Sequence, residues 1–423
     1  MNVEKKVPEL RFKGFSGEWK SFSLDEISDV LDGDRGHNYP NGEDLKEQGH
    51  TLFLSASNVT KNGFKFDTRQ YITQEKSDSL GNGKLFLDDI ILTSRGSIGH
   101  IAWYSEDITK AIPFARINSG MLILRVNDQI APSVISQYLK SPKGKKKIEV
   151  ISFGSAQPQL TKASVSNFLV SIPEEHKEQT QIGNTFQKLD KLINQHQQKH
   201  DKLSNIKKAM LEKMFPKQGE TVPEIRFKGF SGEWEEKKLG EIGETFTGLA
   251  GKTKHDFGHG QARFVTYMNV FANAISNESL VEPVEIDESQ NEVVKGDVFF
   301  TTSSETPEEV GMSSIWMGEA KNVYLNSFCF GYRPKQKIDS VYLAYMLRAS
   351  SFRKQVIFLA QGVSRYNISK TKVMDIKTYM PSLLEQEKIG SYFQKLDALI
   401  NQHQQQITKL NNIKQACLSK MFV

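Results

Sequence analysis

One stretch of 38 residues occurs twice in this chain and constrains its fold more than any other feature. Residues 178–215 and 385–422 align without a gap and are identical at 26 of 38 positions. Neither copy contains proline, and each contains one glycine, near its start. Apolar residues recur at alternating steps of four and three, the pattern of an amphipathic helix with a narrow apolar seam. Each copy is therefore predicted to form one long helix.

A single helix with so narrow a seam is not stable alone in water, so the two copies are predicted to pair with each other. About 30 helical residues form a rod of roughly 45 Å. We expect an antiparallel coiled coil, because the residues between the copies must return the chain to the end where the first helix starts. The residues predicted to pair the helices or to dock partners are Phe186, Leu189, Ile193, His196, Leu203, Phe393, Leu396, Ile400, His403 and Leu410.

A second repeat opens each half of the chain. Residues 7–20 (VPELRFKGFSGEWK) and 222–235 (VPEIRFKGFSGEWE) differ at only two positions. Between this opening segment and the helix the halves diverge, but β-branched and aromatic runs bounded by Gly, Asn and Pro recur at matching places. Such runs are typical of short strands. Each divergent block, about 150 residues long, has the size of an ordinary domain.

The predicted fold class is α+β. It has two mixed α/β domains joined by two long helices that pair as an antiparallel coiled coil, with an internal pseudo-two-fold. The predicted limits are 1–175 for the first domain, 176–215 for the central helix, 216–383 for the second domain and 384–423 for the C-terminal helix.

Composition argues against several classes of protein. The mean hydropathy is −0.47 and no run of about 18 apolar residues is present, which argues against a membrane span. The first residues lack the apolar core of a secretory signal. Two cysteines, Cys329 and Cys417, cannot form a disulfide framework or a cysteine-ligated zinc site. We therefore expect a cytoplasmic protein.

The net charge of +5 is weak evidence for a nucleic-acid partner, but its distribution is more informative. Residues 140–147 read KSPKGKKK, and Arg348, Arg353 and Lys354 lie in the matching part of the second half. Clustered cations are an electrostatic footprint for phosphate groups, although a solvated basic face is a common alternative.

This arrangement resembles the specificity (S) subunits of type I restriction–modification enzymes, and the resemblance covers essentially the whole chain. Three motifs carry it: the duplicated FxGFSGEW phrase, a G-x-x-Q/R-x-x-hydrophobic-S/T-K stretch before each long helix, and the helix opening E-Q-x-x-I-x-x-x-F-x-x-L-D. One departure is that Pro173 lies five residues before Glu178, whereas Pro381 lies four before Glu385.

The resemblance implies a non-catalytic subunit that binds double-stranded DNA. Such a subunit reads an asymmetric, bipartite target, one half per recognition domain, and docks two modification (methyltransferase) subunits. Motor-nuclease restriction subunits join through that complex, which defends the cell against foreign DNA. S-adenosylmethionine would belong to the modification subunits, and ATP and Mg to the motor-nuclease subunits. No cofactor, metal or catalytic residue is expected in this chain.

The residues alone support a compatible hypothesis, because two unlike domains on a rigid rod suit a target of two unlike sequences at fixed separation. Base reading requires side chains such as Arg, Gln, Asn and Ser, with cations on phosphates for positioning. In the first domain the predicted DNA contacts are Arg95, Ser97, Lys143, Gln157, Gln159 and Lys162. In the second they are Thr302, Ser303, Ser304, Arg365, Tyr366, Asn367 and Lys370.

Each of these assignments has a plainer alternative. The loops are also consistent with ordinary turns, and Tyr366 with a packing anchor. His196 and His200 have metal-ligand spacing, but Ile407 replaces His200 in the second copy and no third ligand is evident. Polar seam residues are the favoured interpretation of His196 and His403. For the whole chain, a protein–protein scaffold and a stand-alone methyltransferase or nuclease remain as alternative functions.

Overall fold

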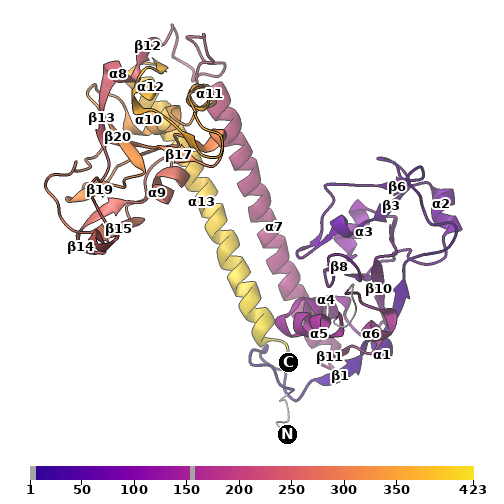
Figure 1. The fold of residues 1–423 in the computed structure, drawn as a ribbon. Helices are drawn as coiled ribbons and strands as arrows, with labels where there is room; N and C mark the ends of the chain where they lie inside the picture. The colour runs from indigo at the N-terminus through magenta and orange to yellow at the C-terminus, as the bar shows by residue number, and fades with distance from the viewer. Residues whose placement is uncertain (1–5, 153–157) are drawn as a thin grey trace. The chain divides into compact units, whose positions relative to one another are not determined.

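The computed structural model describes residues 6–152 and 158–423 (Figure 1). The chain divides into two compact units. Unit 1 consists of residues 1–196 together with 405–423, and unit 2 consists of residues 197–404. Among the helices of the described ranges, none has an apolar stretch long enough to cross a bilayer.

Unit 1 is built around a four-stranded antiparallel sheet in the order β2-β10-β7-β8. Alternate residues of β7 point to opposite faces, as a pleated strand requires. Ile90 and Leu92 pack into one core with residues of helix α4 (Pro132–Lys140), whereas Ile91 packs into a second core with residues of strand β3 (Thr51–Leu54). The strands of this sheet are β2 (Ser28–Asp32), β7 (Ile90–Thr93), β8 (Ile101–Trp103) and β10 (Met121–Val126).

Smaller sheets and short helices complete the part of unit 1 that precedes helix α7 (His176–Lys213). Strand β3 pairs antiparallel with β6 and parallel with β9, and β1 pairs with β11. These strands, with the pair β4 and β5, are β1 (Lys20–Ser23), β3 (Thr51–Leu54), β4 (Val59–Thr60), β5 (Gly63–Phe64), β6 (Tyr71–Ile72), β9 (Ala115–Ile117) and β11 (Leu169–Ile172). The helices are α1 (Leu24–Ile27), η1 (Ala56–Asn58), α2 (Gln74–Ser79), α3 (Glu106–Ala111), α4 (Pro132–Lys140), α5 (Pro142–Ser152) and α6 (Lys162–Ser166).

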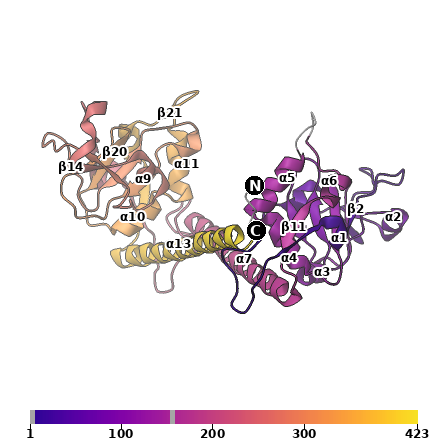
Figure 2. The ribbon, with the colours of Figure 1, turned by 90° about the horizontal axis from the view of Figure 1, so that it is seen from below.

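Unit 2 repeats this plan with a four-stranded sheet in the order β13-β20-β16-β18. Helices α10 (Ser340–Met346) and α11 (Ser350–Phe358) lie beside the sheet (Figure 2), and their residues share one core with Val298 and Phe300 of β16. The sheet contains β13 (Gly243–Thr247), β16 (Val298–Thr301), β18 (Ser313–Ile315) and β20 (Cys329–Pro334).

The remaining strands of unit 2 are β12 (Glu235–Lys238), β14 (Phe257–Val265), β15 (Val281–Val284), β17 (Ser303–Ser304), β19 (Val323–Leu325), β21 (Tyr366–Asn367) and β22 (Lys377–Met380). Its short helices are α8 (Leu239–Ile242), η2 (Lys254–Asp256), α9 (Tyr267–Ala272), η3 (Pro307–Glu309), α10 (Ser340–Met346), α11 (Ser350–Phe358) and α12 (Lys370–Met374).

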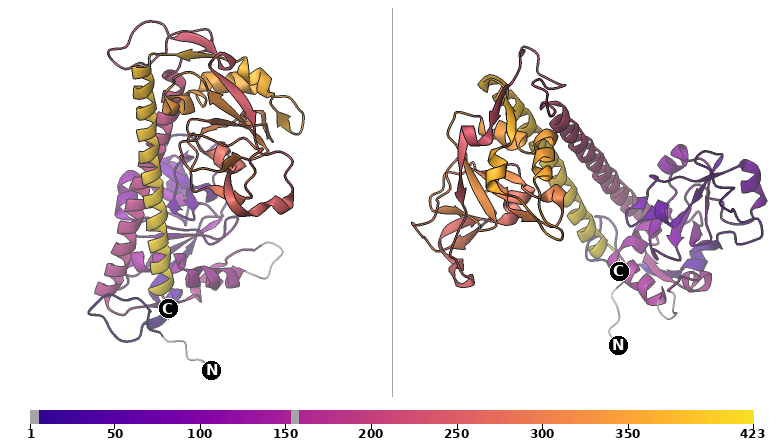
Figure 3. Two further views of the ribbon diagram at one scale, coloured as in Figure 1. Left: turned by 90° about the vertical axis from the view of Figure 1, so that its left-hand side faces the viewer. Right: turned by 45° about the horizontal axis from the view of Figure 1, so that its top comes forward.

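The two long helices predicted from the repeat are confirmed as α7 (His176–Lys213) and α13 (Leu383–Lys420). Each is one continuous helix of 38 residues (Figure 3). The first part of α7 belongs to unit 1 and the rest to unit 2, whereas α13 starts in unit 2 and ends in unit 1. A coiled coil along their full length remains a prediction.

Within unit 1, the start of α7 packs antiparallel against the end of α13. Phe186 stacks on Phe422 with 6.0 Å between ring centroids. One turn further along α7, Asp190 accepts a hydrogen bond from Lys414 Nζ at 2.5 Å. The contacting residue moves back from 422 to 414 as the position along α7 advances from 186 to 190, so the two segments run antiparallel. The equivalent contacts in unit 2 are Phe393 on Phe215 at 5.9 Å and Asp397 with Lys207 at 2.5 Å.

The residues predicted to pair the helices differ in burial. Phe186 and Phe393 are fully buried and Leu396 nearly so, each inside the core of its unit. Leu189 and Leu203 are partly buried against the cores of unit 1 and unit 2, respectively. The other predicted residues are half-buried, namely Ile193, His196, Ile400, His403 and Leu410.

The opening segment of each half is tied to a long helix by a bidentate ion pair. Arg11 donates from Nε and Nη2 to the two carboxylate oxygens of Glu178, both at 2.8 Å, and the Glu178 side chain is 1% exposed. A third donor of Arg11 reaches the Gly17 carbonyl at 2.6 Å. Arg226, Glu385 and Gly232 repeat this geometry in unit 2. The two kinds of repeated segment therefore contact each other in the same way in both units.

We predict that Arg11→Met destabilises unit 1 by ~3–5 kcal/mol, because it leaves the buried Glu178 carboxylate without its partner. Denaturant unfolding of the full chain measures this loss. The double variant Arg11→Met/Glu178→Met should recover most of it, since two apolar side chains leave no buried charge. Lys65→Met, which breaks an exposed pair with Asp67, serves as control and should leave the midpoint unchanged. Equal effects of Arg11→Met and Lys65→Met would contradict this account.

Candidate nucleic-acid interface

In unit 1, three loops meet beside the end of strand β7. The Ser94 amide, directly after β7, donates to the Gly120 carbonyl at 2.8 Å. The Leu160 amide, just before α6, donates to the Ser94 carbonyl at 3.0 Å. The turn at residues 118–120, just before β10, is closed by Asn118 Oδ1, which accepts a hydrogen bond from the Gly120 amide at 2.9 Å. We call residues 94–97, 118–120 and 159–162 the three-loop site of unit 1.

Unit 2 carries the same backbone arrangement beside the end of β16. The Thr302 amide donates to the Phe328 carbonyl at 3.0 Å, and the Ile368 amide donates to the Thr302 carbonyl at 3.0 Å. Asn326 Oδ1 accepts from the Phe328 amide at 2.9 Å. Residues 302–304, 326–328 and 365–370 form the three-loop site of unit 2. Both sites thus rest on matching hydrogen bonds although the surrounding sequences differ.

A fourth element, held by a buried asparagine, lies between β3 and β4 in unit 1 and after β14 in unit 2. Asn58 Nδ2 donates to the carbonyls of Lys65 and Thr68 at 3.1 and 2.7 Å. Asn269 Nδ2 makes the corresponding bonds in unit 2, to Asn277 and Leu280 at 2.8 and 2.9 Å. In unit 2 the helix α9 that carries this asparagine lines one open pocket with the three loops. That pocket contains Tyr267, Met268, Phe271, Ser303, Ser304, Glu305, Glu309, Phe328, Ser364 and Arg365.

The structure brings together four of the residues predicted to bind DNA in unit 1. Arg95, Ser97, Gln159 and Lys162 are all exposed at its three-loop site. Lys162 is the first residue of α6, directly after the N-cap Thr161. Lys143 is also exposed, but it lies on α5 rather than in the three loops. Gln157 lies outside the described residues.

In unit 2 the predicted residues fall into two groups. Ser303 and Ser304 are each only 7% exposed, because strand β17 pairs with β21. The Ser304 hydroxyl donates to the Thr306 carbonyl, and the Thr302 hydroxyl donates to the Phe328 carbonyl at 2.8 Å. The hydroxyl donors of Thr302 and Ser304 are therefore used inside the loop. The exposed members are Arg365, Asn367 and Lys370, with Tyr366 half-buried.

The interpretation of Arg348 and Arg353 as cations on a phosphate-binding or solvated face is wrong. Both guanidinium groups point into unit 2 and donate to backbone carbonyls, and burial lowers the pKa of each to about 10. They remain charged at neutral pH but are used to hold loops together. The acceptors are Val270, Phe271, Asn273 and Ser313 for Arg348, and Glu308, Val310 and Gly311 for Arg353.

Two exposed residues at the site of unit 2 were not predicted from the sequence. Met268 is 62% exposed on α9, and Phe328 is 59% exposed in the turn before β20. The predicted DNA contacts are polar or charged side chains together with Tyr366, and they include neither residue. A usable signal was present, since Phe328 follows an Asn-Ser pair at the place where the first half has Gly120.

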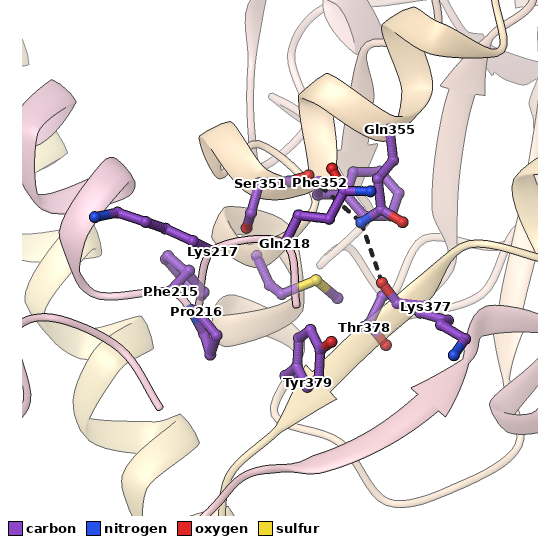
Figure 4. A pocket seen from close by; sticks show the side chains of 11 residues that line it. Phe215, Pro216, Lys217, Gln218, Ser351, Phe352, Gln355, Lys377, Thr378 and Tyr379 are labelled. Carbon is purple, nitrogen blue, oxygen red and sulfur yellow. Dashed lines mark hydrogen bonds between the residues drawn. The ribbon is translucent and has the colours of Figure 1, made fainter. Parts of the chain in front are cut away.

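A second pocket of unit 2 lies where the chain leaves α7 (Figure 4). Phe215, Pro216 and Gln218 face Phe352 and Tyr379 there, and Gln355 Nε2 donates to the Lys377 carbonyl at 3.2 Å. The cavity holds about 20 Å³, room for about one water molecule. It is a packing gap and offers no space for a ligand.

Both halves of the chain are similar to one known protein family. The family model for the type I restriction modification DNA specificity domain matches residues 16–205 and 231–412. The chain belongs to this DNA specificity family. The resemblance of its motifs to specificity subunits is thereby confirmed, and each half contains one match.

Individual relatives of the specificity family agree with this assignment. A putative type I restriction enzyme MjaX specificity subunit from Methanocaldococcus jannaschii is 27% identical over 197 residues, which span 45% of this chain and 45% of the relative. The crystal structure of a type I restriction–modification S subunit from M. genitalium matches with a TM-score of 0.60 at 16% identity, covering 99% of both chains. A chain from a type I R-M system studied for complex assembly matches with a TM-score of 0.50 at 16% identity, covering 95% of this chain and 96% of that one. These structures confirm the fold class.

Lys162 and Lys370 offer a direct test of the interface, because both are exposed first residues of the short helices that follow the third loop. We predict that Lys162→Ala and Lys370→Ala each reduce the slope of log K against log salt concentration by about 1, the loss of one phosphate contact. Fluorescence anisotropy with labelled duplex DNA at several salt concentrations measures the slope.

The matched control is Lys295→Ala, since Lys295 is an exposed lysine of unit 2 that pairs with Glu319 and lies outside the three-loop site. Its slope should equal that of the unmodified chain. An unchanged slope for both Lys162→Ala and Lys370→Ala would remove these lysines from the interface.

Proposed function

We propose that this chain reads DNA sequence as the specificity subunit of a type I restriction–modification complex. One observation carries the proposal. Each unit has a three-loop site built on the same hydrogen bonds, and the two sites present different side chains. A fixed scaffold with variable exposed residues is what sequence reading requires, because base edges differ only in their pattern of donors, acceptors and methyl groups.

The target of such a chain is bipartite and asymmetric, with one half read by each unit. Unit 1 presents Arg95 beside a glycine, whereas unit 2 presents Phe328 and Arg365. Arginine donors suit guanine, and apolar groups suit thymine, so sites of unlike chemistry read unlike bases. The exposed lysines Lys162 and Lys370 would position the domains on phosphates, in the same place in each half.

We also propose that the chain docks two modification subunits and, through them, the motor-nuclease subunits. The repeat supports two equivalent docking faces, since helix α7 and helix α13 each carry the same half-buried residues at matching positions, such as Ile193 and Ile400. Methyl transfer from S-adenosylmethionine to adenine would be performed by the modification subunits, and ATP hydrolysis with Mg by the motor-nuclease subunits. This chain would supply target choice and assembly.

Sequencing of DNA methylation tests the proposal in cells that express the chain with its modification subunit, compared with cells that lack only this chain. We expect a methylated motif made of two short, unlike sequences separated by unspecified bases, present only with the chain. A methylation pattern that does not depend on the chain would contradict DNA reading. Copurification with the modification subunit, without any effect on methylation, would favour the scaffold alternative.

A further inference from the structure

The three-loop site of unit 2 exposes an apolar surface that the fold does not require. Met268 and Phe328, more than half exposed, line one open pocket with Tyr267, Phe271 and Arg365. Tyr267 is held in place by its hydroxyl, which donates to the Ser303 carbonyl at 2.8 Å, and its ring stacks on Phe271. The rim of the pocket is therefore ordered, with Met268 and Phe328 as its solvent-facing apolar members.

The matched positions in unit 1 are identified by the asparagine anchors. Asn58 and Asn269 make corresponding hydrogen bonds, so Met268 matches Ser57, the residue before Asn58. Asn118 and Asn326 each accept from the amide two residues later, so Phe328 matches Gly120. Equal backbone positions thus carry a hydroxyl and no side chain in unit 1, but two large apolar side chains in unit 2.

At a third matched position the larger, exposed side chain belongs to unit 1 instead of unit 2. Ser94 and Thr302 donate to the carbonyls of the matched residues Gly120 and Phe328, so Arg95 matches Ser303. Arg95 is exposed, whereas Ser303 is 7% exposed. A Cβ placed on Gly120 would lie 3.9 Å from the Cβ of Arg95, so the two positions are neighbours. Unit 1 therefore offers a cation at the place where unit 2 offers an aromatic ring.

The charges around the pocket of unit 2 indicate which part of a DNA duplex fits it. Glu305, Glu309 and Arg365 line the pocket and are all exposed, so two carboxylates outweigh one guanidinium and the pocket repels phosphate on balance. Carboxylates do accept hydrogen bonds from the exocyclic amino group of cytosine or adenine. The edge of a base pair, rather than the backbone, is thus the complementary surface. The only apolar group that the major groove exposes is the C5-methyl of thymine.

We infer that Met268 and Phe328 are specificity-determining residues that pack against the C5-methyl group of a thymine in the half-site read by unit 2. The inference rests on the proposed function, since it names the base chemistry that one of the two sites recognises. Unit 1, with Ser57, Gly120 and Arg95 at these positions, lacks the apolar surface and does not select thymine in this way.

Removing the methyl group from the DNA tests the contact without altering the protein. The probe is a duplex carrying the sequence that the chain directs for methylation, with deoxyuridine in place of every thymidine of the second half-site. Binding is measured with the full chain copurified with its modification subunit. We expect an affinity about fourfold lower than for the thymidine duplex, the value for burial of one methyl-sized group. The same replacement in the first half-site should not depend on Met268 or Phe328.

The variant Met268→Ser/Phe328→Gly gives unit 2 the side chains of unit 1 at these two positions. It should bind the thymidine and deoxyuridine duplexes with equal affinity. Met268→Leu, which keeps the apolar contact, should retain the fourfold preference for thymidine.

Four results would overturn the inference while leaving the proposed function intact. The first is equal binding of both duplexes by the unmodified chain, and the second is a fourfold preference that survives in the double variant. The third is a uniform loss of affinity for both duplexes in the variant with an unchanged preference, as expected for a side chain wedged between base steps. The fourth is a second half-site without thymine. If the double variant fails to fold, comparison of the thymidine and deoxyuridine duplexes with the unmodified chain and with Met268→Leu still tests the methyl contact.

Failure of the proposed function would be seen differently, as the absence of any sequence-dependent binding by the unmodified chain.

Discussion

The core of each unit is completed by an aromatic residue that lies two residues beyond the end of a long helix, and that helix begins in the other unit. In unit 1, Phe422 lies among Trp19, Tyr138 and Phe186, with ring centroids 5.7–6.1 Å apart. In unit 2, Phe215 occupies the same place among Trp234, Tyr342 and Phe393. These aromatic side chains are almost fully buried, and aromatic residues dominate core energetics. Unit 1 therefore includes residues 405–423 in its core, and both long helices must run continuously for both cores to form.

The opening segments and the long helices depend on each other for the same reason. The buried carboxylates of Glu178 and Glu385 each need the guanidinium of an opening segment, since an isolated buried charge is strongly unfavourable. The strongly repeated parts of the sequence are thus the parts that meet in the cores. The divergent parts lie between them, and there the hydrogen bonds of the three-loop sites persist while exposed side chains change. A scaffold of this kind allows the reading residues to vary without loss of the fold.

The sequence predicted the long helices well because their pattern is local: no proline, one early glycine and a regular apolar seam. Within unit 1 the predicted residues Arg95 and Lys162 are exposed at one three-loop site, and within unit 2 Arg365 and Lys370 are exposed at the other. The interior role of Arg348 could not be predicted, because its acceptors are backbone carbonyls that no sequence motif marks. The sequence predicts a loop at Ser303 and Ser304, but these residues form strand β17, whose pairing with β21 depends on a segment more than 60 residues away. Met268 and Phe328 were missed because exposure of an apolar residue is decided by tertiary structure.

The central claim is that two matched sites each read their own half of one DNA target. Methylation sequencing with the single variants Arg95→Ser and Arg365→Ser tests it most directly, since each variant changes an exposed arginine in one site only. The account predicts that Arg95→Ser relaxes base preference in one half of the motif and Arg365→Ser in the other, with the remaining half unchanged each time. Relaxation of the same half by both variants, or full retention of the motif by both, would contradict it.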